Sequence, residues 1–155
     1  MPATVVGVSI CYLAIDVGGV KLAAAVVSEQ GEVLVRDRIA TPQREVWPAL
    51  SRLVLRVMAA APTPPVGCGV GCGGPMNPAE RTVSPLYIPS WKAFPLAAEV
   101  EALTQLPTVV DNNGKSVALG EAWCGAAGGL TDFVAVVRGA GVAGGGVSEE
   151  WHSRR

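Results

Sequence analysis

The sequence predicts an α/β fold, with a mixed sheet whose elements follow one another in the order βββαβαβ. Three short apolar segments joined by tight connections come first, which indicates an antiparallel meander. Segments with helical periodicity then alternate with short strands, so helices are expected to pack on the sheet. The chain has 155 residues, of which half are hydrophobic and 16% are charged. That composition supports one ordinary domain with a sizeable core.

In the first part of the chain, strands are expected at 11–16, 21–28 and 33–41, with a turn at 29–32. A helix is expected at 46–61 because its apolar side chains recur on one face and prolines follow it. The side chains on the expected core face are Val46, Leu50, Leu53, Val54 and Val57, with Arg52 and Arg56 turned toward water.

In the second part, a short strand at 66–71 runs into a glycine-proline segment. The Pro-rich stretch 77–95 is expected to be a loop of the length that often serves function. Helices at 96–106 and 115–123, strands at 108–111 and 132–137, and a glycine cluster at 139–146 follow in that order. Residues 147–155 have no periodicity. We therefore expect a folded lobe over 1–146 and an unpatterned tail over 147–155, beginning where a glycine-rich turn should continue into more sheet.

Composition disfavours several classes of function. The formal net charge is −1 and no basic stripe is present, which argues against nucleic acid and against an anionic membrane surface. No apolar run reaches the length of a membrane span. The first ten residues lack the basic start of a secretory signal, so a cytoplasmic location is expected. Four scattered cysteines and a single histidine, His152, do not form a zinc-ligand pattern, and free buried thiols are expected instead.

The first candidate site is the segment from Asp16 to Lys21. The glycines Gly18 and Gly19 permit positive φ and a tight hairpin, and they leave backbone amides open to an anion. Asp16 could hold a hydrated metal ion near a phosphate. A structural hairpin capped by Asp16 explains these residues equally well.

Two further candidate segments lie at strand ends: a glycine loop rich in exposed backbone at 69–75, and a polar cluster between a strand and a helix at 111–115. Polar groups at the carboxyl ends of strands lie where open α/β sheets bind ligands, and a helix N-terminus favours negative charge. Simpler alternatives remain open: a helix cap for Asn112 and Asn113, a plain turn for 73–75 and a loose loop for 139–146. Each alternative is the stronger explanation for its own segment, but the joint order of the segments favours a site.

From about Leu13 to Gly146 the chain resembles the N-terminal portion of the ROK family of sugar kinases and repressors. Five segments carry the resemblance. Residues Asp16–Lys21 are similar to the family motif Asp-Ile-Gly-Gly-Thr-Lys, Gly69–Pro75 to its glycine-rich strand that ends in Gly-Pro, and Ser84–Trp91 to Ser-Pro-Leu-Asn-Ile-Pro-x-Trp. Residues Asp111–Glu121 are similar to Asp-Asn-Asp-Ala-Lys-x-x-Ala-Leu-Gly-Glu, and Ala140–Gly145 to Thr-Gly-Val-Gly-Gly-Gly.

The resemblance implies an actin-like, ribonuclease H-like ATPase fold with two lobes around a cleft. It also implies a glucokinase-like transfer of the γ-phosphoryl group of ATP, with Mg²⁺, to a hydroxyl of a sugar, a hexose in the first instance. By resemblance, the cofactor-binding residues are Asp16, Gly18, Gly19, Lys21, Gly141 and Gly144, and the substrate-binding residues are Gly73, Tyr87, Asn112 and Glu121. Glu121 lies on a helix and also fits a structural role. Asn113 occupies the position of the family's catalytic Asp.

The chain departs from the family pattern at that catalytic position. The carboxamide of Asn113 is not a base at neutral pH, and loss of general-base assistance typically costs roughly 10²–10⁴-fold in rate. Other polar or glycine positions of the family are changed at Val20, Tyr87, Ala140 and Ala143. The family's C-terminal lobe, with further sugar ligands and a Cys/His zinc site, is expected to be missing.

Three hypotheses follow from these comparisons. The chain is a sugar kinase of the family, active or nearly so; a noncatalytic remnant that binds sugar or nucleotide weakly; or a repressor of the same family. Asn113 and the missing lobe discriminate between the first two, so little or no activity is expected. The repressor is disfavoured because only about a dozen residues precede the first strand, too few for a helix-turn-helix. An isolated lobe would expose apolar surface, so homo-oligomers are expected.

Overall fold

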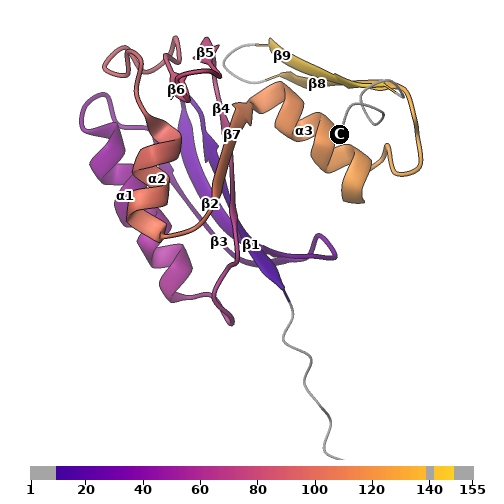
Figure 1. The fold of residues 1–155 in the computed structure, drawn as a ribbon, viewed down its shortest axis with the longest axis horizontal. Helices are drawn as coiled ribbons and strands as arrows, with labels where there is room; N and C mark the ends of the chain where they lie inside the picture. Colours follow the sequence, from indigo (N-terminus) through magenta and orange to yellow (C-terminus); the bar gives the residue numbers. More distant parts are fainter. Residues whose placement is uncertain (1–9, 139–141, 149–155) are drawn as a thin grey trace, which may run out of the picture.

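The computed structural model describes residues 10–138 and 142–148. Its centre is a five-stranded sheet in the order β3-β2-β1-β4-β7 (Figure 1). The strands are β1 (Cys11–Val17), β2 (Lys21–Ser28), β3 (Val33–Ala40), β4 (Cys68–Cys72) and β7 (Thr108–Asn112). The first three form the expected antiparallel meander, and β4 and β7 run parallel to β1. The mixed sheet and the βββαβαβ order are therefore confirmed.

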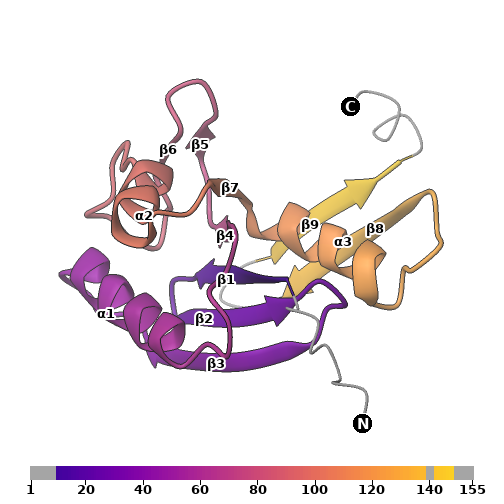
Figure 2. The same cartoon turned by 60° about the horizontal axis from the view of Figure 1, so that its bottom comes forward.

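Helices α1 (Val46–Ala59) and α2 (Leu96–Thr104) cover one face of this sheet (Figure 2). Both end two residues before the position expected from the sequence. Every second side chain of β1 and β2 is buried beneath the helices, as the alternation of Leu13, Ile15 and Leu22 with smaller residues predicts. The five residues expected on the core face of α1 are all buried. This face of the sheet carries the hydrophobic core.

The stretch expected to be a loop contains a small hairpin of two strands, β5 (Met76–Asn77) and β6 (Thr82–Val83). The expectation was wrong here because strands of two residues are too short to show alternation. The segment after the hairpin is tied to the core by aromatic rings. Trp91 stacks on Phe94 with ring centroids 4.3 Å apart, and Phe94 lies 5.9 Å from Trp47 of α1.

Helix α3 (Asn113–Cys124) lies on the opposite side and packs against a separate two-stranded sheet of β8 (Phe133–Arg138) and β9 (Val142–Val147). The glycine cluster was expected to be a turn or loose loop, and for 142–146 that expectation was wrong, since these residues form β9. The glycines let β9 lie close to the backbone of α3, because a Cβ on Gly145 would lie 2.8 Å from the Cα of Lys115. Strand β9 includes Val147, the first residue of the expected tail.

Among residues 10–138 and 142–148, no helix combines the length and the apolarity that crossing a membrane requires. All four cysteines are free thiols. The expectation of buried thiols is confirmed for Cys11, Cys68 and Cys72. It was wrong for Cys124, which is exposed at the end of α3.

Candidate functional site

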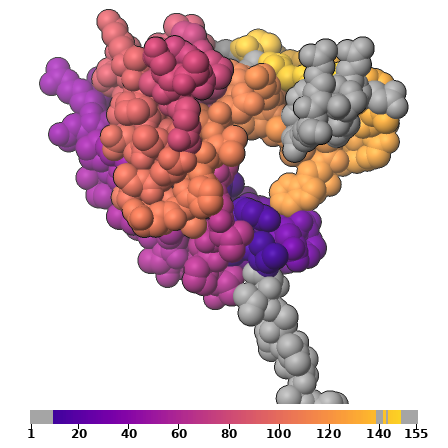
Figure 3. All heavy atoms as spheres, viewed as in Figure 1, coloured from indigo at the N-terminus to yellow at the C-terminus, as the bar shows by residue number. Residues whose placement is uncertain are grey.

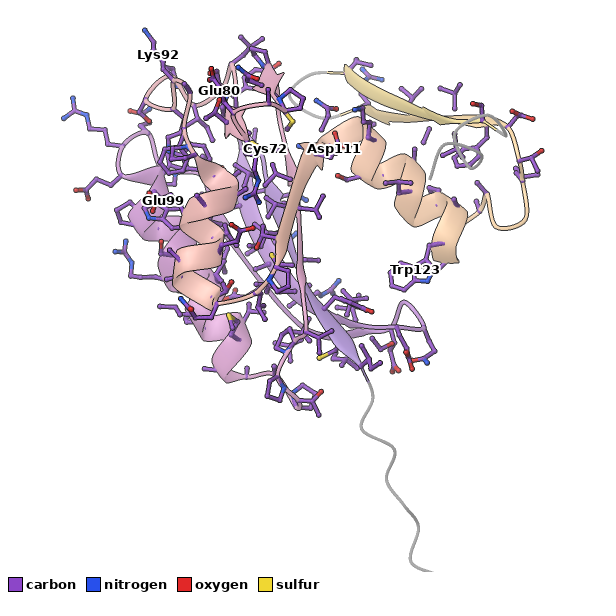
Figure 4. All side chains as sticks on the ribbon, viewed as in Figure 1. Cys72, Glu80, Lys92, Glu99, Asp111 and Trp123 are labelled. Carbon is purple, nitrogen blue, oxygen red and sulfur yellow. The ribbon has the colours of Figure 1, made fainter. Side chains whose placement is uncertain are left out.

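Three parallel strands end side by side at one edge of the sheet. In their register Asp16 of β1 pairs with Gly71 of β4, and Gly71 pairs with Asp111 of β7. Neighbouring strands lie about 4.8 Å apart, so the two aspartates stand roughly 10 Å apart on one face. Figure 4 shows Asp111 where β7 meets α3, with Cys72 on the adjacent strand. The hairpin after β1 and the end of β7 at Asn112 therefore lie at the same edge of the sheet, with the end of β4 between them.

The hairpin between β1 and β2 is tight and is held by a hydrogen bond from a residue outside it. The Gly18 amide donates to the Lys21 carbonyl at 3.1 Å, and the Thr41 hydroxyl donates to the Gly18 carbonyl at 2.7 Å. Neither glycine adopts the positive φ that the sequence suggested. Gly19 is needed for a different reason. A Cβ there would overlap the Cβ of Tyr87 and would lie 2.8 Å from its Cγ.

The carboxyl group of Asp16 is half-buried beside this hairpin. Burial raises its pKa above the ordinary value, and the nearby ammonium of Lys21 partly opposes that rise. A carboxylate penalised by desolvation gains from a bound cation. The described residues hold no group of three or more His, Cys, Asp or Glu side chains placed to share a metal. Mg²⁺ does not require such a group, because it binds one or two carboxylates together with waters and phosphates. Asp16 fits that kind of site.

Asn113, the first residue of α3, lies against β1 and β4. Its Nδ2 donates to the carbonyl of Val17 at 3.5 Å, and its Oδ1 is buried without a hydrogen-bond partner. A Cβ on Gly71 would lie 2.9 Å from that Oδ1 and 3.3 Å from the Oγ of Ser116. Gly71 therefore makes room for the first turn of α3. A carboxylate in the same orientation would set an oxygen against the Val17 carbonyl oxygen.

Asn112 is the N-cap of α3. Its Oδ1 accepts from the Gly114 amide at 2.9 Å, so the cap explanation is confirmed for this residue. Its Nδ2 lies 3.6 Å from the position that a Cβ on Gly74 would take. The amide group of Asn112 thus turns its donor side toward the glycine loop. The side chain of Asp111 accepts from the Asn112 amide at 2.7 Å and pairs with Lys115 at 3.2 Å.

The segment 84–91 joins the hairpin to the glycine loop after β4. The Leu86 amide donates to the Gly74 carbonyl at 3.3 Å, and Tyr87 packs on Gly19. Pro85 lies against Gly73, 3.7 Å from the position of its missing Cβ. The structure thereby brings the predicted residues of the hairpin, the glycine loop, segment 84–91 and the strand end of Asn112 into one continuous surface.

Three predicted residues lie away from that surface or outside the description. Glu121 is eight residues along α3 from Asn113, or about 12 Å. Its carboxylate accepts from the Ala126 amide at 2.7 Å, beyond the end of the helix. Gly144 is in β9, where it meets the backbone of Gly114. Gly141 lies outside the described residues.

Sequence reasoning missed Thr41 and Ser116, which hold the hairpin and face Gly71 respectively. No sequence signal marks Thr41, because it meets Gly18 only through the pairing of β2 with β3. Ser116 stands four residues after Asn112 and could have been found as part of the first turn of α3.

Open space adjoins the site on the face opposite α1. A cavity of about 530 Å³ lies over β1–β3, floored by small residues such as Ala14, Ala23 and Ala25. Its charged lining residues are Asp16, Lys21, Arg36, Asp37 and Arg38. Figure 3 shows an opening between α3 and the first strands of the sheet. A smaller cavity of about 240 Å³ has Asn77, Arg81, Asp111 and Lys115 among its lining residues.

A βββαβαβ sheet with polar strand ends at one edge is the N-terminal lobe of the actin-like ATPase fold. The chain belongs to the ROK family, whose profile matches residues 12–152. It is 31% identical over 140 residues to a glucokinase of Streptomyces coelicolor, covering 86% of the chain and 42% of that enzyme. It is 33% identical over 141 residues to an N-acetylmannosamine kinase of Escherichia coli, covering 88% of the chain and 47% of that enzyme.

Among solved structures, the chain is similar to a ROK family glucokinase from Streptomyces griseus in complex with glucose and AMPPNP. The TM-score is 0.77 at 30% identity, over 89% of this chain and 44% of that one. The chain therefore spans less than half the length of each of these three relatives.

Proposed function

We propose that this chain forms the sugar- and nucleotide-binding edge of an ATP-dependent, glucokinase-like sugar kinase whose transfer step is impaired. One observation carries the proposal. The register of Asp16, Gly71 and Asp111 places the hairpin, the glycine loop and the N-terminus of α3 at a single edge. The family supports it, since a glucokinase and an N-acetylmannosamine kinase match 86% and 88% of the chain, respectively.

Each group at the edge has chemistry suited to one part of the reaction. Mg²⁺, when bound, would neutralise the charge of the phosphates. Asp16 would orient that ion, the backbone of Gly18 and Gly19 would face phosphate, and Lys21 would add positive charge. Around the sugar, the free donor side of Asn112 would bind a hydroxyl, beside Gly73 and Tyr87. For Gly141 and Gly144, a role in nucleotide binding rests on the family resemblance alone. The same holds for Glu121 and sugar binding.

A second candidate, binding of sugar or nucleotide without transfer, is favoured by Asn113. The amide is engaged with the Val17 carbonyl at 3.5 Å, and an amide cannot take the proton of a sugar hydroxyl. The rate should fall by roughly 10²–10⁴-fold relative to a site with a carboxylate base. The two candidates share the same binding edge and differ only in turnover.

Calorimetric titration of the 155-residue chain with glucose, N-acetylmannosamine and Mg-AMPPNP tests the binding edge. We expect saturable heat with one of the sugars and with the nucleotide. Asp16→Asn should weaken binding of Mg-AMPPNP and leave sugar binding unchanged. An ADP-release assay then separates the impaired kinase, with slow turnover, from the binding protein, with none. Absence of binding to both sugars and to the nucleotide would contradict the proposal.

A further inference from the structure

Two apolar departures from the family pattern are neighbours in space. Val20 replaces a Thr in the hairpin, and Tyr87 replaces an Asn in segment 84–91. The two positions are 67 residues apart in sequence, yet Tyr87 packs directly on Gly19, the residue before Val20. The changes therefore alter one surface rather than two.

That surface is exposed and apolar. Val20 is 67% exposed, Leu86 is 77% exposed and Tyr87 is 56% exposed. Large apolar side chains with this much exposure on two contacting segments form a patch rather than scattered surface residues. The base of the Tyr87 side chain is held by Gly19, and Leu86 is held through its amide to Gly74. The patch is thus anchored at both segments.

The patch borders the proposed sugar site. Gly74, which accepts the hydrogen bond from Leu86, also lies beside the donor side of Asn112. A sugar bound at Asn112 would therefore lie next to segment 84–91, which carries Leu86 and Tyr87. An aromatic ring fixed at its base provides a flat apolar surface and loses little entropy when it binds.

We infer that Val20, Leu86 and Tyr87 form an apolar platform, including the Tyr87 ring, for an apolar substituent on the sugar, so that the site selects aryl glycosides over methyl glycosides and free hexoses. The inference rests on the proposed sugar site and deepens it by naming the substrate class. A family member with Thr and Asn at these two positions would present hydroxyl and amide groups here, with no comparable apolar surface.

The test is calorimetric titration of the full chain with three probes: glucose, methyl β-glucoside and phenyl β-glucoside. We expect phenyl β-glucoside to bind about tenfold more tightly than methyl β-glucoside, the effect of removing roughly 55 Å² of apolar surface from water. Tyr87→Asn should bring the two affinities to within about twofold, and Tyr87→Phe should retain the preference.

Tyr12→Asn is the matched control, because it makes the same replacement at the other tyrosine, which is 42% exposed on β1 and four residues from Asp16. The control should keep the preference for the phenyl glycoside. Equal affinities of the two glycosides in the unmodified chain, or a preference that survives Tyr87→Asn, would overturn the platform while glucose binding upholds the site. Failure of all three probes to bind would overturn the platform and the sugar site together.

Discussion

The two faces of the five-stranded sheet differ in what covers them. Beneath α1 and α2, the sheet presents large aliphatic side chains such as Leu13, Leu22 and Val26, all fully buried. The opposite face presents small residues, with Ala14, Ala23 and Ala25 as its floor. There α3 contacts the sheet chiefly at β4 and β7, and its first turn meets Gly71.

The covered face chiefly contributes stability, and the opposite face carries the site that we propose. The covered face supplies the apolar burial that drives folding. The other face uses glycine and alanine to admit a helix end, a hairpin and, in our proposal, a ligand. Substitutions on the covered face should therefore act through packing volume. Substitutions on the open face should act through close backbone contacts and charge, with smaller effects on stability.

The largest effect is expected on the covered face. Leu22→Ala should lower the free energy of unfolding by about 2–5 kcal/mol, because it removes a fully buried side chain and leaves a cavity. Ala23→Ser, the next residue on the opposite face, should change it by less than about 0.5 kcal/mol. Urea unfolding measures both. Similar losses for the two variants would abolish the distinction between the faces.

A pair of glycines in α3 sharpens the comparison. A Cβ on Gly114 would lie 2.6 Å from the carbonyl carbon of Gly144. This atom belongs to the backbone, so relieving the overlap would require α3 or β9 to shift. Gly114→Ala should therefore cost about 1–3 kcal/mol despite the better helix propensity of alanine. Among the residues that the structure describes, no atom outside the backbone of α3 and the neighbouring residues lies within 4 Å of the corresponding position at Gly120, so Gly120→Ala should stabilise by about 1 kcal/mol. Thermal unfolding of the two variants checks the packing of α3 on β9, and stabilisation by both would refute it.

Asn113→Asp should destabilise the chain at pH 7 by about 1–3 kcal/mol, because it buries a charge against the Val17 carbonyl. Burial should raise the pKa of the new carboxyl in the folded state. The loss should therefore be complete above that folded pKa and should disappear as the pH falls below the unfolded value of about 4.

The control for that pH series is Asn112→Asp, since Asp caps a helix as well as Asn does. It should be close to neutral or slightly stabilising at pH 7, with no loss that grows as the pH rises. If Asn113→Asp were equally neutral from pH 4 to pH 8, the amide at 113 would not be held as the structure describes.

The smallest effect is expected at Asp16. Its pKa is raised in the folded state by burial, so its ionised form is disfavoured there. The destabilising contribution is full above the folded pKa and vanishes as the pH falls below the unfolded value. Asp16→Asn should stabilise at pH 7 by only a few tenths of a kcal/mol, because the group is partly exposed and solvent screens it. Chemical denaturation at pH 7 and pH 3.5 would show the gain and its disappearance; a loss of stability at pH 7 would contradict the burial argument.

The sequence predicted the covered face well because local patterns govern it. The alternation of Leu13 and Ile15, and the helical spacing of Leu50, Leu53 and Val57, are visible without any structure. The opposite face could not be predicted in the same way. The contact of Tyr87 with Gly19 joins segments that are far apart in the chain, and no periodicity records it.

The candidate site was predicted in outline and missed in detail. The polar strand ends pointed to one edge of the sheet, and the structure places them there. The sequence did not show which of Asn112 and Asn113 caps the helix, because both residues suit a helix cap. Only the positions of the Gly114 amide and the Val17 carbonyl distinguish the cap from the buried amide. Likewise, the glycines of β9 look like a turn until the backbone of α3 is placed against them.

The most direct test of the binding edge is a backbone amide NMR titration of the ¹⁵N-labelled chain with Mg-AMPPNP. We predict saturable shifts in three segments, 16–21, 71–74 and 111–114. Shifts confined to β8 and β9, or no shifts at millimolar nucleotide, would contradict a nucleotide-binding edge formed by β1, β4 and β7.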